Sequence, residues 1–267
     1  MPRPPRPASL HDLRPAPSAR KKGGYDWDQL DRGAQSGKVT VHFGDVATEL
    51  ERFIRDSPAI VGCVAWVTST RLVEALAGRP VSLVVNKEWS LRTTDTKPAS
   101  ARHRATLSKL KGGLRRSDFP APLRDIAGSP DEIEPVRAVG FAVRGYSTVP
   151  LMHHKFIVRL EEGKPTAAWT GSFNFTVAAE RSLETGLEIH DPKVAAAFLA
   201  EWARTLTLSE PMEFEAGKAQ PDWKTPTPRA ERTTPRKPKQ ETKKQPSKKP
   251  APRKPNAPVR RRNGKVT

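Results

Sequence analysis

Two groups of polar residues in the second half of the chain have side chains suited to chemistry at phosphorus. In the first group, strand spacing places His153 and Lys155 on one face and His154 on the other. A cation beside an imidazole lowers the pKa of the ring and keeps it neutral and nucleophilic. The same ammonium can hold a phosphate oxygen. We therefore interpret His153 and Lys155 as a candidate nucleophile and its charged partner.

The second group follows as Gly171-Ser172-Phe173-Asn174. A glycine at the end of a strand lets the backbone approach a ligand closely. Ser172 and Asn174 are two residues apart, so a hydroxyl and an amide can point to one place as hydrogen-bond donors. Such donors stabilise the negative charge of a phosphoryl group. Together the two groups predict a phosphoryl-transfer site.

These residues resemble the signature of the phospholipase D superfamily, which reads His-x-Lys-x4-Asp, then Gly-Ser-x-Asn, then a Glu about a dozen residues later. The matching positions are His153 and Lys155, the Gly171 to Asn174 segment, and Glu184. The resemblance implies a mixed sheet between helices over about residues 38–208. One position departs from the pattern, because Leu160 stands where the Asp is expected. Glu161 is one residue further on and is a possible replacement; a degenerate, inactive copy is the alternative.

The resemblance also implies a two-step, metal-independent reaction. His153 attacks phosphorus, and a second histidine protonates the leaving oxygen and then activates water. Lys155, Ser172 and Asn174 would hold the phosphate, and Glu184 would orient His153. No other histidine has a lysine two residues later, so the second copy must come from another subunit and a homodimer is predicted. We predict no cofactor and no metal, because no cluster of metal-binding residues accompanies the motif.

The surrounding pattern predicts an α/β fold, a mixed β-sheet flanked by helices on both faces. Buried or alternating strands and amphipathic helices follow one another, and no internal repeat is visible. The strands are expected at 39–43, 59–67, 80–86, 136–143, 151–160, 166–170 and 187–189. The helices are expected from Asp45 to Ile54, after Ser69, weakly around Leu107 to Leu114, and at 192–208.

Charge divides the chain into three parts. The net charge is +18, of which residues 217–267 carry +14 and residues 1–24 carry +5, so that the middle is close to neutral. We predict a disordered Pro/Arg-rich leader at 1–24, a phospholipase D-like domain at 25–210 and a disordered Lys/Arg/Pro-rich tail at 211–267. Tyr25 and Trp27 are candidate anchors that hold the polar segment 25–37 to the domain.

The basic tails predict a polyanionic partner. We expect nucleic acid, with DNA favoured over RNA; an anionic membrane surface and a merely solubilising tail are the alternatives. No stretch has the length and hydropathy of a membrane span, which predicts a soluble, cytoplasmic protein. The single cysteine, Cys63, lies in an apolar run and is expected to be a small buried hydrophobe.

Three functions fit these observations. The first is a dimeric, endonuclease-like phosphodiesterase that acts on nucleic acid. The second is a phospholipid phosphodiesterase or phosphatidyl transferase. The third is a catalytically impaired nucleic-acid-binding protein. The sequence does not decide whether Trp66, Lys87, Trp89 or the basic stretch 92–116 lines the substrate groove, because ordinary core packing is the more common role of aromatic residues.

Overall fold

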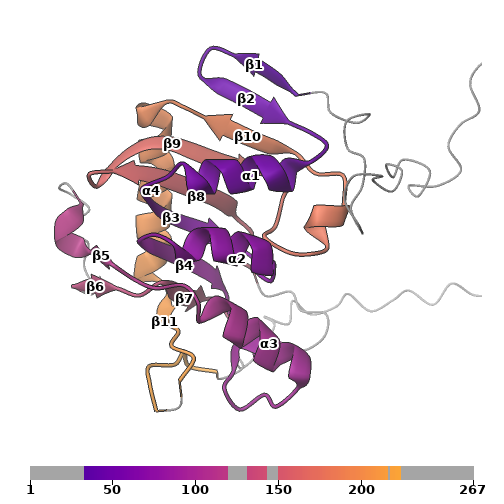
Figure 1. Cartoon of the computed structure of the whole chain (residues 1–267). Coiled ribbons are helices and arrows are strands. Elements are labelled where there is room, and N and C mark those ends of the chain that lie inside the picture. The colour runs from indigo at the N-terminus through magenta and orange to yellow at the C-terminus, as the bar shows by residue number, and fades with distance from the viewer. Residues whose placement is uncertain (1–32, 120–130, 143–149, 216, 224–267) are drawn as a thin grey trace, which may run out of the picture. The chain divides into compact units, whose positions relative to one another are not determined.

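The computed structural model describes residues 33–119, 131–142, 150–215 and 217–223, and its main feature is one mixed sheet (Figure 1). Its nine strands lie in the order β1-β2-β10-β9-β8-β3-β4-β7-β11. The bounds are β1 Ala34–Ser36, β2 Val39–His42, β3 Ala59–Val64, β4 Val81–Asn86, β7 Val136–Val139, β8 Lys155–Glu161, β9 Lys164–Gly171, β10 Gly186–Ile189 and β11 Glu210–Pro211. A separate two-stranded ladder pairs β5, Leu114–Arg115, with β6, Glu132–Ile133.

The centre of the sheet is parallel and its flanks are antiparallel. Strands β3, β4 and β7 run parallel, whereas β8 pairs with β3 in the antiparallel direction. The long hairpin β8–β9 then continues antiparallel to β10 and β2. As a result, the carboxyl ends of β3 and β4 lie at the same edge as the start of β8.

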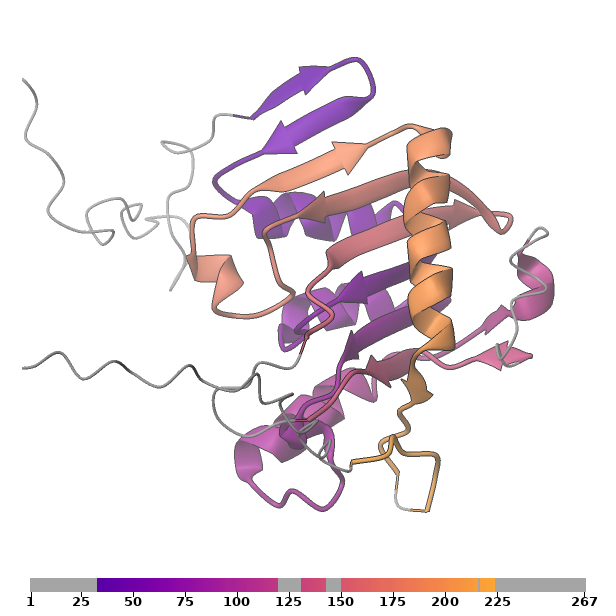
Figure 2. The same ribbon diagram turned by 180° about the vertical axis from the view of Figure 1, so that it is seen from behind.

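Helices cover both faces of the sheet. Helices α1, Val46–Arg55, α2, Thr70–Ala77, and α3, Pro98–Leu107, lie on one face, and α4, Pro192–Thr207, crosses the other (Figures 1 and 2). Short 3-10 helices are formed by η2 Trp89–Leu91, η3 Arg116–Asp118 and η5 Ala179–Arg181. The predicted fold class, a mixed sheet with helices on both faces, is confirmed.

Side-chain caps fix where three of these helices begin. Asp45, Ser69 and Asp191 each accept a hydrogen bond from a backbone N–H of the first helical turn. Pro192 occupies the first turn of α4, where its missing N–H is not needed. The starts of α1 and α2 therefore agree with the predicted capping residues Asp45 and Ser69, and α4 begins at Pro192 as predicted.

The sheet separates two apolar cores. One core lies under α1, α2 and α3 and includes Ile60, Ile157 and Trp169; the other lies under α4 and includes Phe156 and Trp202. Cys63 is fully buried in the second core, and burial raises the pKa of its thiol to about 12. The prediction that Cys63 is a small buried hydrophobe is confirmed.

Several predicted elements differ from the structure. The strands expected at 59–67 and 136–143 end earlier, at Val64 and Val139. The strand expected at 151–160 begins only at Lys155, so His153 lies in the segment that leads into β8. The helix expected around Leu107 to Leu114 corresponds to α3, which ends at Leu107. Leu110 lies in the loop after α3 and Leu114 in β5, and both side chains are buried. The spacing of the three leucines therefore reflects their burial in the core, although they do not lie on one helix.

Packing continues beyond the boundary predicted at residue 210. Pro211 belongs to β11, Met212 is 1 % exposed in the core, and Trp223 packs against it. The buried Lys87 ammonium bonds to the Glu210 carboxylate and donates to the Asp222 carbonyl at 2.8 Å. The predicted leader at 1–24, the candidate anchors Tyr25 and Trp27, and the tail from 224 onward lie outside the described residues.

Among the helices that the structure describes, none has both the length and the apolar character needed to span a membrane.

Candidate active site

Strand register brings the predicted site residues to one edge of the sheet. Lys155 pairs with Val64 at the carboxyl end of β3, and Phe156 pairs with Thr170 near the end of β9. Gly171 pairs in turn with Gly186 at the start of β10. Neighbouring strands are about 4.8 Å apart, so the ends of β8, β9 and β10 are close neighbours.

His153 is exposed at this edge, just before β8. Its ring meets the ring of Trp66 edge to face, with 5.1 Å between the centroids and an angle of 75° between the planes. Partial burial, and then the positive charges of Lys155 and His154, lower the pKa of His153. The imidazole is therefore biased toward the neutral form that a nucleophile requires.

Lys155 is the first residue of β8 and is half-buried. Its ammonium donates to the His153 carbonyl at 2.9 Å and lies 5.6 Å from the centroid of the Trp66 ring. Burial lowers the pKa of Lys155, and the nearby Glu184 carboxylate opposes this shift. The sequence placed His153 and Lys155 on one strand; in the structure they are neighbours through this hydrogen bond and through Trp66.

The side chains of Ser172 and Glu184, near the two ends of the segment that connects β9 to β10, are joined by a hydrogen bond. The Ser172 hydroxyl donates to the Glu184 carboxylate and accepts from the Thr185 N–H at 3.0 Å. Gly171 makes this approach possible, because a Cβ at residue 171 would stand 2.0 Å from the Thr185 carbonyl oxygen. In this structure the Glu184 carboxylate accepts a hydrogen bond from Ser172 and acts on the Lys155 ammonium through its charge. The expected hydrogen bond between His153 and Glu184 is absent.

Asn174 has a half-buried side chain whose amide oxygen is buried without a hydrogen-bond partner among the described residues. Such a group costs about 1–3 kcal/mol, and in native proteins it often serves a ligand or ordered water. The adjoining Phe175 carbonyl accepts from the N–H groups of Thr68 and Ser69, at 2.8 and 2.9 Å. These bonds attach the loop that contains Asn174 to the segment between β3 and α2.

His154 points away from this group, as the strand spacing predicted. Its ring lies 3.1 Å from a carboxylate oxygen of Glu201 on α4 and 5.6 Å from the Phe156 ring. Its backbone carbonyl accepts from the Ala65 N–H at 2.9 Å. His154 therefore ties the edge to the opposite helical layer and is a matched control for His153.

Leu160 is 1 % exposed and packs in the core under α4. Glu161 is exposed at the far end of β8, where it accepts from the Thr166 hydroxyl at 3.2 Å. Six residues of strand separate Glu161 from Lys155, which is roughly 20 Å. Glu161 therefore lies far from His153, as does Leu160 at the position of the missing Asp, and the suggestion that Glu161 replaces that Asp stays a prediction.

Trp66 and Glu88 also belong to the surroundings of the site. Trp66 follows β3 and touches both His153 and Lys155, and Glu88 follows β4 and lies beside Trp66 around a small enclosed space. In the sequence, Trp66 lies within the apolar run 59–67 and looks like one more core residue. Its position just after the last strand residue was the one available signal. Among the described residues, no three His, Cys, Asp or Glu side chains are grouped so as to hold a metal ion.

Comparison with known proteins supports the resemblance noted in the sequence. No protein-family model matches the chain. An uncharacterized protein, L381, of Acanthamoeba polyphaga mimivirus is 25 % identical over 197 residues, which is 67 % of this chain and 69 % of that protein. A protein named phospholipase D from Rickettsia prowazekii (strain Madrid E) is 37 % identical over 71 residues, 26 % of this chain and 33 % of that protein. The resemblance to the phospholipase D superfamily is confirmed.

A solved structure of the phospholipase D superfamily was also found. It is Nuc from Salmonella typhimurium, described as a phospholipase D family member, with 20 % sequence identity and a TM-score of 0.42. The likeness covers 64 % of this chain and 95 % of the Nuc chain.

Proposed function

We propose that the chain is a phosphodiesterase that acts on nucleic acid through a phosphohistidine intermediate. The observation that carries this proposal is the neutral-biased imidazole of His153 beside the Lys155 ammonium, at the edge that also holds Ser172, Asn174 and Glu184. A nucleophile, a cation and hydrogen-bond donors for phosphate oxygens are thereby grouped. None of these roles requires a metal ion.

In the proposed first step, a ring nitrogen of His153 forms a bond to phosphorus and the bond from phosphorus to the leaving oxygen breaks. A second histidine gives its proton to that oxygen. In the second step, water attacks phosphorus, the phosphorus–nitrogen bond breaks, and the second histidine takes the proton from water. The charge that develops on the phosphoryl oxygens is held by Lys155, Ser172 and Asn174.

The second histidine is proposed to be His153 of another copy of the chain. The other described histidines have structural partners: His42 stacks on Trp169, His103 bonds to the Val67 carbonyl, and His190 bonds to Glu188. A two-fold dimer would place two copies of residue 153 on either side of one phosphate.

Nucleic acid is the proposed substrate because the basic excess of the sequence lies in residues 1–24 and 217–267. Such charge binds a phosphate backbone without reading its sequence. A phospholipid is the second candidate, and the observation in its favour is the similarity to the Rickettsia protein named phospholipase D.

One assay separates these functions. The full chain is incubated in chelator with labelled single- and double-stranded DNA, with RNA, and with phosphatidylcholine vesicles. We expect turnover of nucleic acid that falls about 10³-fold or more in His153→Ala and stays within about threefold in the His154→Ala control. Turnover of phosphatidylcholine alone would favour the lipid enzyme. Salt-sensitive binding without turnover of any substrate would favour the impaired binding protein.

A subunit-mixing experiment tests the shared site. Wild-type protein is exchanged with increasing amounts of His153→Ala, and activity is measured per wild-type subunit. If each site needs two copies of His153, this activity falls in proportion to the wild-type fraction, because mixed dimers are inactive. Constant activity per wild-type subunit would show that one chain suffices.

A further inference from the structure

Trp66 contacts both the candidate nucleophile, His153, and its cation, Lys155. The edge of the His153 ring meets the indole at 5.1 Å between centroids, and the Lys155 ammonium lies 5.6 Å from the centroid of the same ring. The contact geometry is T-shaped in the first case and of the cation–π kind in the second. A single aromatic ring therefore spans the pair.

The backbone places these three residues next to one another. Val64, at the end of β3, pairs with Lys155, and the Ala65 N–H donates to the His154 carbonyl at 2.9 Å. Trp66 comes immediately after these pairings, two residues beyond the end of β3, the strand that lies beside β8. The indole thus follows directly on the strand that fixes the start of β8.

Glu88 lies beside the Trp66 indole. It lies two residues beyond the end of β4, is half-buried, and lines the same small enclosed space as Trp66. Burial raises the pKa of Glu88, and the polar side-chain groups of Trp66 and Ser90 oppose the shift. The space enclosed by Trp66, Glu88 and His103 is too small for a water molecule, so the indole is packed against protein on this side.

We propose that Trp66 is a positioning residue that fixes the His153 imidazole relative to the Lys155 ammonium, and that Glu88, packed beside the indole, fixes Trp66. The catalytic consequence rests on the proposed function, whereas the ring contact itself belongs to the resting protein. His153 lies outside the strand, makes no ring hydrogen bond to a described residue, and has two free side-chain torsions. Packing against the indole restricts those torsions before substrate arrives, which is the condition for an effective attack.

The main alternative is that Trp66 stacks on a base of the substrate, since aromatic rings bind single-stranded nucleic acid in this way. The two roles differ in kinetics. Loss of a positioning residue lowers kcat with little change in KM, whereas loss of a stacking surface raises KM with little change in kcat.

The test uses the full chain with Trp66→Leu, Trp66→Phe, Glu88→Gln and Glu88→Ala. The His153 ring is followed by NMR as pH is varied, and each variant's fold is checked by circular dichroism. We expect Trp66→Leu to shift the ring resonances and to raise the pKa of His153 toward 6.5, because the ring loses its covering indole. Trp66→Phe retains a ring and should show a smaller change, and Glu88→Gln retains the size of the side chain and should resemble the wild type. Glu88→Ala should change His153 in the same direction as Trp66→Leu.

The kinetic arm uses the nucleic-acid substrate. We expect kcat to fall about 10- to 100-fold in Trp66→Leu with KM within about threefold of wild type. Trp89→Leu is the matched control, because the Trp89 ring lies under the Arg92 guanidinium, 4.6 Å away.

Unchanged His153 resonances and pKa in both Trp66→Leu and Glu88→Ala would overturn the proposal, and so would a rise in KM at constant kcat. If the wild-type protein turns over no substrate, the proposed function fails, and the NMR measurements still decide whether Trp66 positions His153.

Discussion

The ionisation of His153 depends on neighbours that can be changed one at a time. Its pKa is lowered first by burial, and then by Lys155 and His154. Because a positive neighbour disfavours the imidazolium, we expect Lys155→Met to raise the pKa of His153, measured by NMR titration of the ring. His154→Ala should raise it less. A lower pKa in Lys155→Met would contradict the assignment of Lys155 as the cation that keeps His153 neutral.

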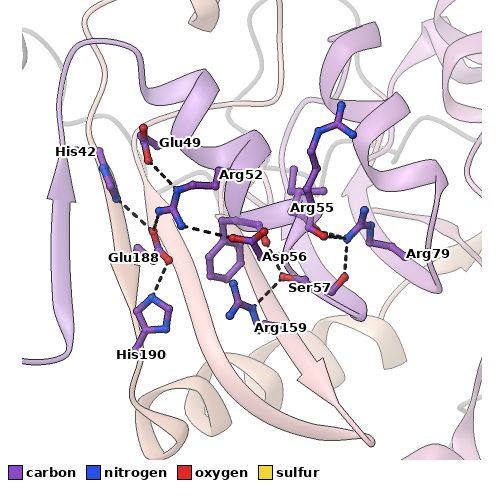
Figure 3. Close-up of polar contacts among 12 residues, drawn as sticks. His42, Glu49, Arg52, Arg55, Asp56, Ser57, Arg79, Arg159, Glu188 and His190 are labelled. Atoms are coloured by element: carbon purple, nitrogen blue, oxygen red, sulfur yellow. Dashed lines mark hydrogen bonds and ion pairs between the residues drawn. The ribbon is translucent and has the colours of Figure 1, made fainter. Parts of the chain in front are cut away.

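Glu188 is a second residue with a strongly shifted ionisation, on the other side of the sheet from α4. It is 2 % exposed on β10, and its carboxylate lies 2.6 Å from the Arg52 guanidinium and 2.7 Å from the His190 ring (Figure 3). His42 approaches the same carboxylate at 3.4 Å. Although burial opposes it, hydrogen bonding from His42 and the charge of Arg52 lower the pKa of Glu188 to about 2.

This lowered pKa predicts how Glu188 contributes to stability. The contribution is complete above the unfolded pKa of about 4.5 and is lost as pH falls toward 2, because protonation removes the bonded charge. We expect Glu188→Gln to lower the free energy of unfolding at pH 7 by roughly 2–3 kcal/mol, measured by urea denaturation. Glu49→Gln, which removes an exposed partner of the same Arg52, should cost under about 0.5 kcal/mol. Equal effects of the two substitutions would disprove the role of burial.

At the scale of the elements, the close pairing of β9 and β10 controls the Ser172–Glu184 contact. Gly171→Ala would place a Cβ 2.0 Å from the Thr185 carbonyl oxygen, so the strands must separate. We expect a loss of at least about 2 kcal/mol in unfolding free energy, together with lower activity. Gly78→Ala is the control, because no atom lies within 4 Å of the added methyl at the end of α2. Thermal melts of both variants measure the difference.

The elements that could be predicted are those whose residues carry a strong local signal. Buried β3 and β4 have continuous apolar runs, and α1, α2 and α4 have capping side chains. Strands β1 and β11 were not predicted, because β1 is exposed and polar and β11 is two residues long and contains Pro211. Both exist only through pairing with a neighbouring strand, which local composition does not encode.

The same reasoning applies to the candidate site. The types and spacing of His153, Lys155 and Ser172 were visible in the sequence, and the structure gathers them at one edge. The contacts of Trp66 with His153 and Lys155 were not visible in the sequence. They depend on the pairing of β3 with β8, two strands that are about ninety residues apart in the chain. Likewise, nothing in the sequence indicated that Ser172 would hold Glu184.

At the scale of the whole molecule, the basic residues beyond position 226 can be deleted without removing any residue that the structure describes. Residues 227–267 contain 15 Lys and Arg and 2 Asp and Glu. Deleting them should weaken nucleic-acid binding and lower the slope of log K against log salt, since each phosphate contact contributes about 0.7–0.9 to that slope. The melting temperature should be unchanged, because the Lys87 bonds to Glu210 and Asp222 are retained. Replacing the same Lys and Arg by Gln in the full chain is the matched control for length, and an unchanged salt slope would refute the assignment.

The burial of Lys87 has a consequence for how a bound polymer would be linked to the domain. Lys87, with a side chain 5 % exposed, grips the segment that leads to the basic tail, and the next residue, Glu88, lies beside Trp66. The tail is therefore attached to the domain at the end of β4, two strands from Lys155 in the sheet. If the tail binds nucleic acid, as proposed, the polymer would be linked to the domain through the segment that Lys87 holds, and its effective concentration around the domain would exceed its concentration in solution.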